Sequence, residues 1–272
     1  TTAQEWETMG IGAFDIVKGG TPAADKTDTM TNGTVTISDL STGMYLVVVG
    51  TYDANDADHK YGVVTSDEYY YEFTPYLISL PSNNYYAETS IGGATGNDDW
   101  IYDVTTGLKP QRTDRLGKLR IYKDLLTFNR TMNSPGNGND DGATFVFKVN
   151  VKKGDVVYYD NVVAIRMRDA GKSAPVEIGE FPAGSVVTVS EIYSGSCYYN
   201  LPDKTTYVVE AEGNNAEESR TATDFKIVAD STIAATFVND WKNSDRGGYG
   251  IVNKFKWETN QFKHKVTEGG HN

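Results

Sequence analysis

The sequence has very few of the residues that build cross-linked or metal-bound sites. It contains a single cysteine, Cys197, so no disulfide can form within the chain. Its three histidines, His59, His264 and His271, are scattered, and no His/Cys cluster has zinc-site spacing. No apolar run reaches the ~18 residues of a membrane span. No signal peptide is recognisable, but a trimmed or mature chain would lack one, so its absence does not place the protein in the cytoplasm.

Basic residues are also scarce. The 272 residues include 25 Lys and Arg against 37 Asp and Glu, which gives a formal net charge of −12. Nucleic acids and anionic membrane surfaces both require clustered basic side chains. The charge balance therefore argues against both of these partners.

Residues typical of β-strands are abundant. Tyrosine occurs 18 times and glycine 27 times, and an apolar content of 39% is enough to build real cores. We find no long amphipathic helix and expect at most a short helical turn at residues 5–9. The pattern predicts an all-β protein made of immunoglobulin-like Greek-key β-sandwiches. The expected strands include residues 35–37, 44–49, 76–80, 119–123, 145–151, 156–158, 162–167, 186–192, 206–210 and 233–238.

The length suits two domains better than one. A polar segment at residues 110–114 separates two strand-rich halves. We place an N-terminal domain at residues 1–114 and a second domain at residues 115–244. Residues 245–272 are expected to form a C-terminal hairpin that packs on the second domain.

Two loops are rich in Asp, Asn and Gly, at residues 53–58 and 133–142. Such loops can bind calcium through oxygen ligands. Neither loop matches the ligand spacing of an EF-hand, and a solvated turn is the favoured interpretation.

Three predicted strands end an apolar face in a polar residue, because side chains two apart on a strand share a face. The three residues are Lys123, Glu191 and Asn239. Burial drives a lysine toward its neutral form and a glutamate toward its protonated form. A neutral amine is a nucleophile, and a protonated carboxyl can polarise the asparagine carbonyl and pass a proton to departing ammonia. The trio therefore predicts a Lys–Asn isopeptide bond that needs no cofactor, since folding supplies the proximity.

A plainer alternative exists for the same pattern. Strand ends often carry polar residues, so Lys123 could lie on the surface, Glu191 at an edge and Asn239 at a strand end without meeting. Periodicity alone favours this alternative.

The residues around these positions resemble a known family. Residues 117–242 are similar to a CnaB-type domain of Gram-positive pilins, in the segments GKLRIYKDL, FVFKVNV, FPAGSVVTVSEI and ATFVNDW. In that family the first-strand lysine and the last-strand asparagine are joined, and the glutamate of a TVxE-like stretch catalyses the joining. The resemblance thus implies a cross-link between Lys123 and Asn239, with Glu191 as the catalytic residue.

The first half resembles the N-terminal domain of a backbone pilin. MGIGAFDIVKG is similar to one strand of that domain, and ISDLSTGMYLVVV and TPYLISLP are similar to two others. Position 49 is Val where the family often has Glu, so the resemblance does not extend a cross-link to this half. It also implies an opening strand, for which no residues are found before Thr1.

Residues 100–111, WIYDVTTGLKPQ, resemble the pilin motif WxxxVxVYPK. Trp100, Val104 and Lys109 fall at its spacing, whereas residues 106–108 depart from the usual Val-Tyr-Pro. In the family this lysine attacks the acyl-enzyme that a sortase forms with the next subunit. The resemblance therefore implies that Lys109 is the intersubunit acceptor; the alternative is an ordinary linker lysine.

The resemblance implies a shaft subunit of a covalently polymerised pilus on the cell wall of a Gram-positive bacterium. The expected partners are identical subunits joined head to tail, a pilus sortase, minor pilins and host surface ligands. An adhesin or tip pilin stays open as an alternative, although a tip subunit needs no acceptor lysine. No nucleophile–base constellation, metal site or phosphate loop points to an enzyme, and no cofactor or, after processing, membrane partner is expected. An LPxTG-like sorting signal is absent and is expected beyond Asn272.

Overall fold

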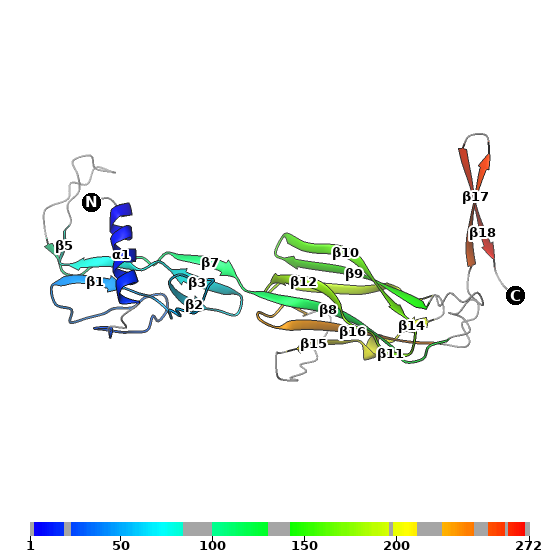
Figure 1. The fold of residues 1–272 in the computed structure, drawn as a ribbon, viewed down its shortest axis with the longest axis horizontal. Helices are drawn as coiled ribbons and strands as arrows, with labels where there is room; N and C mark the ends of the chain where they lie inside the picture. Colours follow the sequence, from blue (N-terminus) through cyan, green and yellow to red (C-terminus); the bar gives the residue numbers. More distant parts are fainter. Residues whose placement is uncertain are drawn as a thin grey trace. The chain divides into compact units, whose positions relative to one another are not determined.

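The computed structural model describes residues 3–18, 23–83, 100–129, 142–195, 198–210, 225–241, 250–258 and 261–269. The chain divides into two compact units, Thr1–Thr113 and Asp114–Asn272. Strands account for most of the regular structure in both units, which confirms the all-β class (Figure 1). Within the described ranges, the helices fall short of the length and hydropathy that a bilayer span requires.

The first unit opens with an α-helix, α1 (Ala3–Val17), where the sequence predicted a short turn followed by a strand. That prediction was wrong. The helical pattern lies in Trp6, Gly10 and Phe14, which recur every four residues and so share one face of a helix. Glycine disfavours the helix interior, which weakens this signal in the sequence.

Contacts with strand β4 (Tyr76–Leu80) stabilise α1. The Trp6 indole Nε1 donates a hydrogen bond to the Leu77 carbonyl at 2.7 Å, and Phe14 is buried. Gly10 lies so close to β4 that a Cβ atom there would be 2.9 Å from Tyr76 Cα. Tertiary packing on β4 therefore outweighs the low helix propensity of the glycine.

The two glycines of α1 provide a matched pair of substitutions. Gly10→Ala places a methyl group against backbone atoms of β4, and we expect it to lower the unfolding free energy of the first unit by about 1–3 kcal/mol. Gly12 has nothing within 4 Å of a Cβ position, so Gly12→Ala should raise that free energy by up to about 1 kcal/mol. Urea unfolding followed by circular dichroism measures both changes. Equal effects of the two substitutions would contradict the packing of α1 on β4.

Besides α1, the described part of the first unit contains three small sheets. One pairs β1 with β4, one runs β2-β3-β7, and one pairs β5 with β6. The remaining strands are β1 (Gly43–Val47), β2 (Gly62–Thr65), β3 (Tyr69–Phe73), β5 (Ser82–Asn83), β6 (Trp100–Ile101) and β7 (Pro110–Asp114). The strand predicted at residues 35–37 does not form, and Val35 and Ile37 are exposed. Without a buried face to cover, this short β-branched run has no partner strand.

Among the described residues, the sandwich of the second unit, between Leu116 and Trp241, is built from two sheets. One has the order β10-β9-β13, and the other is centred on β8 and β16, with β11, β12, β14 and β15 at its sides. Figure 1 shows β9 and β10 in one layer and β8 and β16 in the other. The strands are β8 (Leu116–Leu125), β9 (Ala143–Lys153), β10 (Val156–Met167), β11 (Gly171–Lys172), β12 (Val176–Pro182), β13 (Val186–Tyr193), β14 (Tyr198–Asn200), β15 (Thr206–Glu210) and β16 (Thr232–Trp241). A 3-10 turn, η1 (Pro202–Lys204), precedes β15.

The core of the second unit lies between these two sheets. Along β9, Phe145, Phe147 and Val149 alternate inward and are fully buried, and Leu119 and Ile121 face them from β8. This is the period-2 alternation that predicted the strands. Further along the chain, β17 (Gly250–Glu258) pairs antiparallel with β18 (Gln261–Gly269), in the segment where the hairpin was expected.

Candidate functional site

The topology of the second unit brings Lys123, Asn239 and Glu191 together. β8 and β16, the first and last strands of the sandwich, are neighbours and run parallel, with Lys123 opposite Phe237 and Asn239 opposite Leu125. Lys123 and Asn239 are thus two residues out of register on the same face of one sheet. Glu191 reaches them from β13 in the other sheet.

The three side chains form one chain of contacts. Lys123 Nζ donates hydrogen bonds to Asn239 Oδ1 at 2.6 Å and to the Phe237 carbonyl at 2.9 Å. Asn239 Nδ2 donates to Glu191 Oε1 at 2.6 Å. Glu191 Oε2 lies 3.6 Å from Lys123 Nζ, which closes the triangle. The amine and the carboxamide that it would attack are therefore in direct contact.

Burial of this cluster is nearly complete. Lys123 and Asn239 are 0% exposed and the Glu191 side chain is 1% exposed. Burial lowers the pKa of Lys123 from 10.5 to about 8, against the opposing influence of the Glu191 carboxylate. Burial likewise raises the pKa of Glu191, although Lys123 and Asn239 act in the other direction. Both shifts favour a neutral amine beside a protonated carboxyl over an ion pair.

The second oxygen of Glu191 supports the same protonation state. Oε2 is buried and makes no hydrogen bond to the residues that the structure describes, with Lys123 Nζ beyond hydrogen-bond distance at 3.6 Å. A buried carboxylate oxygen without a partner is costly, whereas a protonated carboxyl bears no full charge. Because Oε2 faces the amine and Oε1 faces the amide nitrogen, Glu191 can accept a proton from one and deliver a proton to the other.

The contacts refine the role expected for Glu191. The sequence suggested that its acid would polarise the asparagine carbonyl and pass a proton to the departing ammonia. In the structure Glu191 contacts the amide nitrogen of Asn239, while Lys123 contacts the carbonyl oxygen. The carboxyl is therefore adjacent to the group that would depart as ammonia.

Two aromatic residues belong to this site and were missed in the sequence. The Phe145 ring lies 4.8 Å from Lys123 Nζ, and the Phe237 carbonyl accepts a hydrogen bond from the same amine. Phe145 lies on the inward face of the FVFKVNV strand, so the alternation could have placed it in the core. Nothing in the sequence shows that it covers the amine, because that contact joins different strands.

The pilin-motif residues belong to the first unit, whereas the cluster belongs to the second. Lys109 is exposed and directly precedes β7, and Trp100 is exposed in β6, whereas Val104 is half-buried. The structure thus places Lys109 in an exposed position directly before a strand.

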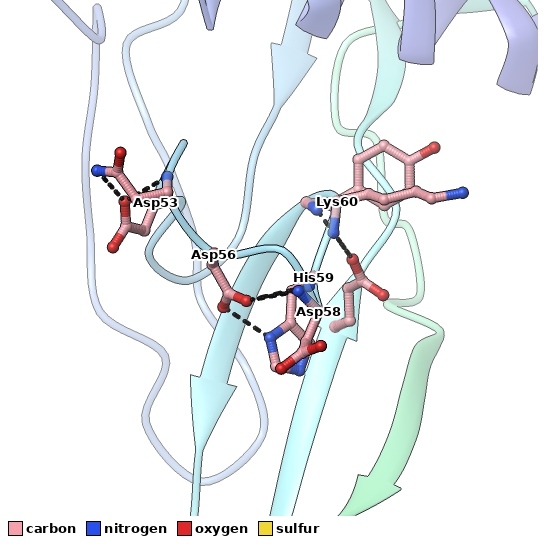
Figure 2. Close-up of polar contacts among 8 residues, drawn as sticks. Asp53, Asp56, Asp58, His59 and Lys60 are labelled. Carbon is pink, nitrogen blue, oxygen red and sulfur yellow. Dashed lines mark hydrogen bonds and ion pairs between the residues drawn. The ribbon is translucent and has the colours of Figure 1, made fainter.

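In the first Asp-rich loop, residues 53–58, the carboxylates of Asp53 and Asp56 bond to residues within the loop or directly after it (Figure 2). Asp53 Oδ1 accepts hydrogen bonds from the backbone and side chain of Asn55, and Asp56 Oδ1 accepts from the backbone of Asp58. Asp56 Oδ2 lies 2.7 Å from His59 Nδ1. Among the described residues, no group of three His, Cys, Asp or Glu side chains is arranged to hold a metal ion.

Some residues considered in the sequence lie outside the described residues. They are Cys197, His271 and most of the second Asp-rich loop, residues 133–141. Val49, at the position where the pilin resemblance leads one to expect glutamate, follows β1 in the first unit.

No protein-family model matches the chain, and no curated protein sequence does either. Solved structures do match it. The chain resembles the major pilin T3.2 from Streptococcus pyogenes serotype GAS13637, with a TM-score of 0.32 and 13% identity over 76% of this chain and 70% of that one. A bacterial adhesin from Mobiluncus mulieris with intramolecular disulfide, isopeptide and ester bond cross-links has a TM-score of 0.29 and 12% identity, over 66% and 61%. The major pilin T-13 from Streptococcus pyogenes serotype GAS131465 has a TM-score of 0.29 and 14% identity, over 76% and 70%.

Proposed function

We propose that the chain is a structural subunit of a covalently polymerised surface pilus, and that its second unit carries an isopeptide bond between Lys123 and Asn239. The observation that supports this is the contact of Lys123, Asn239 and Glu191 within one buried cluster. A buried lysine facing a carboxamide and a carboxyl is costly to retain for packing alone. Conversion to an amide removes the ionisable amine and joins β8 to β16, the first and last strands of the sandwich.

The proposed reaction is an intramolecular transamidation catalysed by Glu191. The neutral amine of Lys123 attacks the Asn239 Cγ atom, so that the Nζ–Cγ bond forms and the Cγ–Nδ2 bond breaks. One amine proton moves to Glu191, and Glu191 gives one proton to Nδ2, which leaves as ammonia. The Phe237 carbonyl orients the amine, and Phe145 excludes water from it. Proximity within the folded core replaces an external activating group.

The bond would have a mechanical role. It joins β8 to β16, which are adjacent and parallel and stand at the two ends of the sandwich sequence. A force pulling on the two ends of the unit would otherwise separate these strands by breaking backbone hydrogen bonds. With the bond in place, the load passes through a covalent link, as a shaft subunit requires.

For assembly, we propose that Lys109 is the acceptor amine to which a sortase joins the next subunit outside the cell. Its exposure supports this role, because an enzyme must reach the amine. The alternative of an adhesin or tip subunit has the same sandwich but needs no acceptor lysine.

Mass spectrometry tests the cross-link directly. The intact mass of the purified chain should be smaller than its sequence mass by one molecule of ammonia. Proteolysis should release a branched peptide that joins the segment around Lys123 to the segment around Asn239. A mass equal to the sequence mass, with the Lys123 and Asn239 segments released as two separate peptides, would show that the bond does not form.

A further inference from the structure

Strand β10 forms an open edge of the second unit. Among the described residues it pairs only with β9, in the sheet β10-β9-β13 (Figure 1). An edge strand leaves alternate backbone N–H and C=O groups unpaired and can add a strand from another chain. This edge also carries large apolar side chains in solvent, among them Val156, Val157 and Val162, at 56%, 56% and 45% exposure. A long exposed edge of this kind is suited to a partner strand.

The residue order of β10 is complementary to itself in an antiparallel arrangement. If a two-fold axis passes through Val163, Asp160 of one copy lies opposite Arg166 of the other, and the same pair recurs on the other side of the axis. Between these two charge pairs, Val162 of each copy lies opposite Ala164 of the other. Asp160, Val162, Ala164 and Arg166 are all exposed, on the same face of the strand. The edge therefore presents an apolar centre between two opposite-charge pairs.

Other registers of the same pairing lose this match. An axis midway between two residues would place exposed residues opposite inward-facing ones, which the pleat of a sheet does not allow. An axis at Val162 places Asp160 opposite Ala164, so the second copy offers Asp160 no opposite charge. An axis at Ala164 places Asp160 opposite Arg168, which lies beyond the end of β10, and sets Val162 opposite Arg166 in the apolar centre. Within β10, the axis at Val163 is thus the register that keeps exposed residues opposite exposed ones and pairs Asp160 with a residue of opposite charge.

From this register we propose that β10 is a self-association surface, at which a second copy of the chain joins the two three-stranded sheets edge to edge. Asp160 already has an ion pair of 2.5 Å with Lys148 of its own chain, and the partner's arginine would approach from the open side. Each copy carries a net charge of −12, so two copies repel each other at long range. The pairs between Asp160 and Arg166 attract at short range, and they therefore fix the register of the two strands. In the pilus proposed above, this contact would hold neighbouring fibres side by side.

Charge exchange tests this register. Sedimentation velocity of the whole chain over a concentration series should show a monomer–dimer equilibrium. Asp160→Arg and Arg166→Asp each place like charges opposite one another in a homodimer, and each should weaken dimerisation at least about tenfold. An equimolar mixture of the two variants restores both opposite-charge pairs, so it should form mixed dimers with about the wild-type affinity.

Controls separate this contact from changes in the fold. Lys148→Ala removes the ion pair within the chain and leaves Asp160 and Arg166 in place, so it should dimerise like the wild type. Circular dichroism establishes that each variant is folded. A wild-type chain that stays monomeric at every concentration overturns the proposal. So do single variants that dimerise as well as the wild type, and variants that fail to restore dimers when mixed.

Discussion

We expect the Glu191→Gln variant to keep the full mass of its own sequence and to lose about 5 kcal/mol of unfolding free energy in the second unit. Glutamine has the shape of glutamate and can still contact the Asn239 amide, but it cannot carry a proton from Lys123 to the leaving nitrogen. The isopeptide bond should therefore not form. Without the bond, the unfolded chain regains the entropy of a loop of 116 residues, which the relation used for disulfides places at about 5 kcal/mol.

Intact-mass measurement and urea unfolding, followed by circular dichroism, give the two readouts. Glu180→Gln is a matched control, because Glu180 is an exposed glutamate of the same unit. It should show the same loss of one ammonia and the same stability as the wild type. A Glu191→Gln chain that still lacks one ammonia would exclude Glu191 as the proton carrier. A chain with the full mass and unchanged stability would mean that the bond does not stabilise the unit.

We expect Lys109→Arg to abolish the ladder of high-molecular-weight polymers on cells that produce the protein. Arginine keeps the positive charge and much of the length of lysine, but its guanidinium stays protonated and does not act as an amine nucleophile. The acyl-enzyme formed with the next subunit would then have no acceptor, and only monomers would be detected. Immunoblotting of cell-wall extracts under denaturing conditions measures the ladder.

Lys60→Arg is the matched control for this experiment. Lys60 is another exposed lysine of the first unit, and its replacement should leave the ladder intact. The purified Lys109→Arg chain should also keep the mass deficit of one ammonia, which separates polymer assembly from the internal cross-link. If the ladder persists in Lys109→Arg, another lysine is the acceptor and the role proposed for Lys109 is wrong.

The faces of the strands in the second unit were predictable from the sequence. Alternation along LRIYK, VTVSE and ATFVN placed Lys123, Glu191 and Asn239 inward, and all three side chains are buried in the structure. This succeeds because the two-residue period of a strand is a local property of the backbone. The same reasoning predicted a strand at residues 35–37 that does not form, since an isolated β-branched run needs a partner strand.

Helix α1 shows the limit of local patterns. MGIGAFDIVKG resembles a strand of the pilin domain, yet these residues lie mostly within a helix. What decides the outcome is the close approach of Gly10 to Tyr76, together with the bond from Trp6 to the Leu77 carbonyl. Both contacts join residues far apart in the chain, so no window of sequence contains them.

The absence of a disulfide within the chain follows from the sequence by itself, and strand alternation made Lys123, Glu191 and Asn239 candidates for inward positions, since composition and strand period are local. Only the tertiary structure decided that the three residues meet, that Glu191 faces the amide nitrogen, and that β10 is left at an open edge. Those features depend on which strands pair and in which register. Pairing is settled by the burial of a whole core rather than by any one segment, because a strand gains stability only against its neighbours.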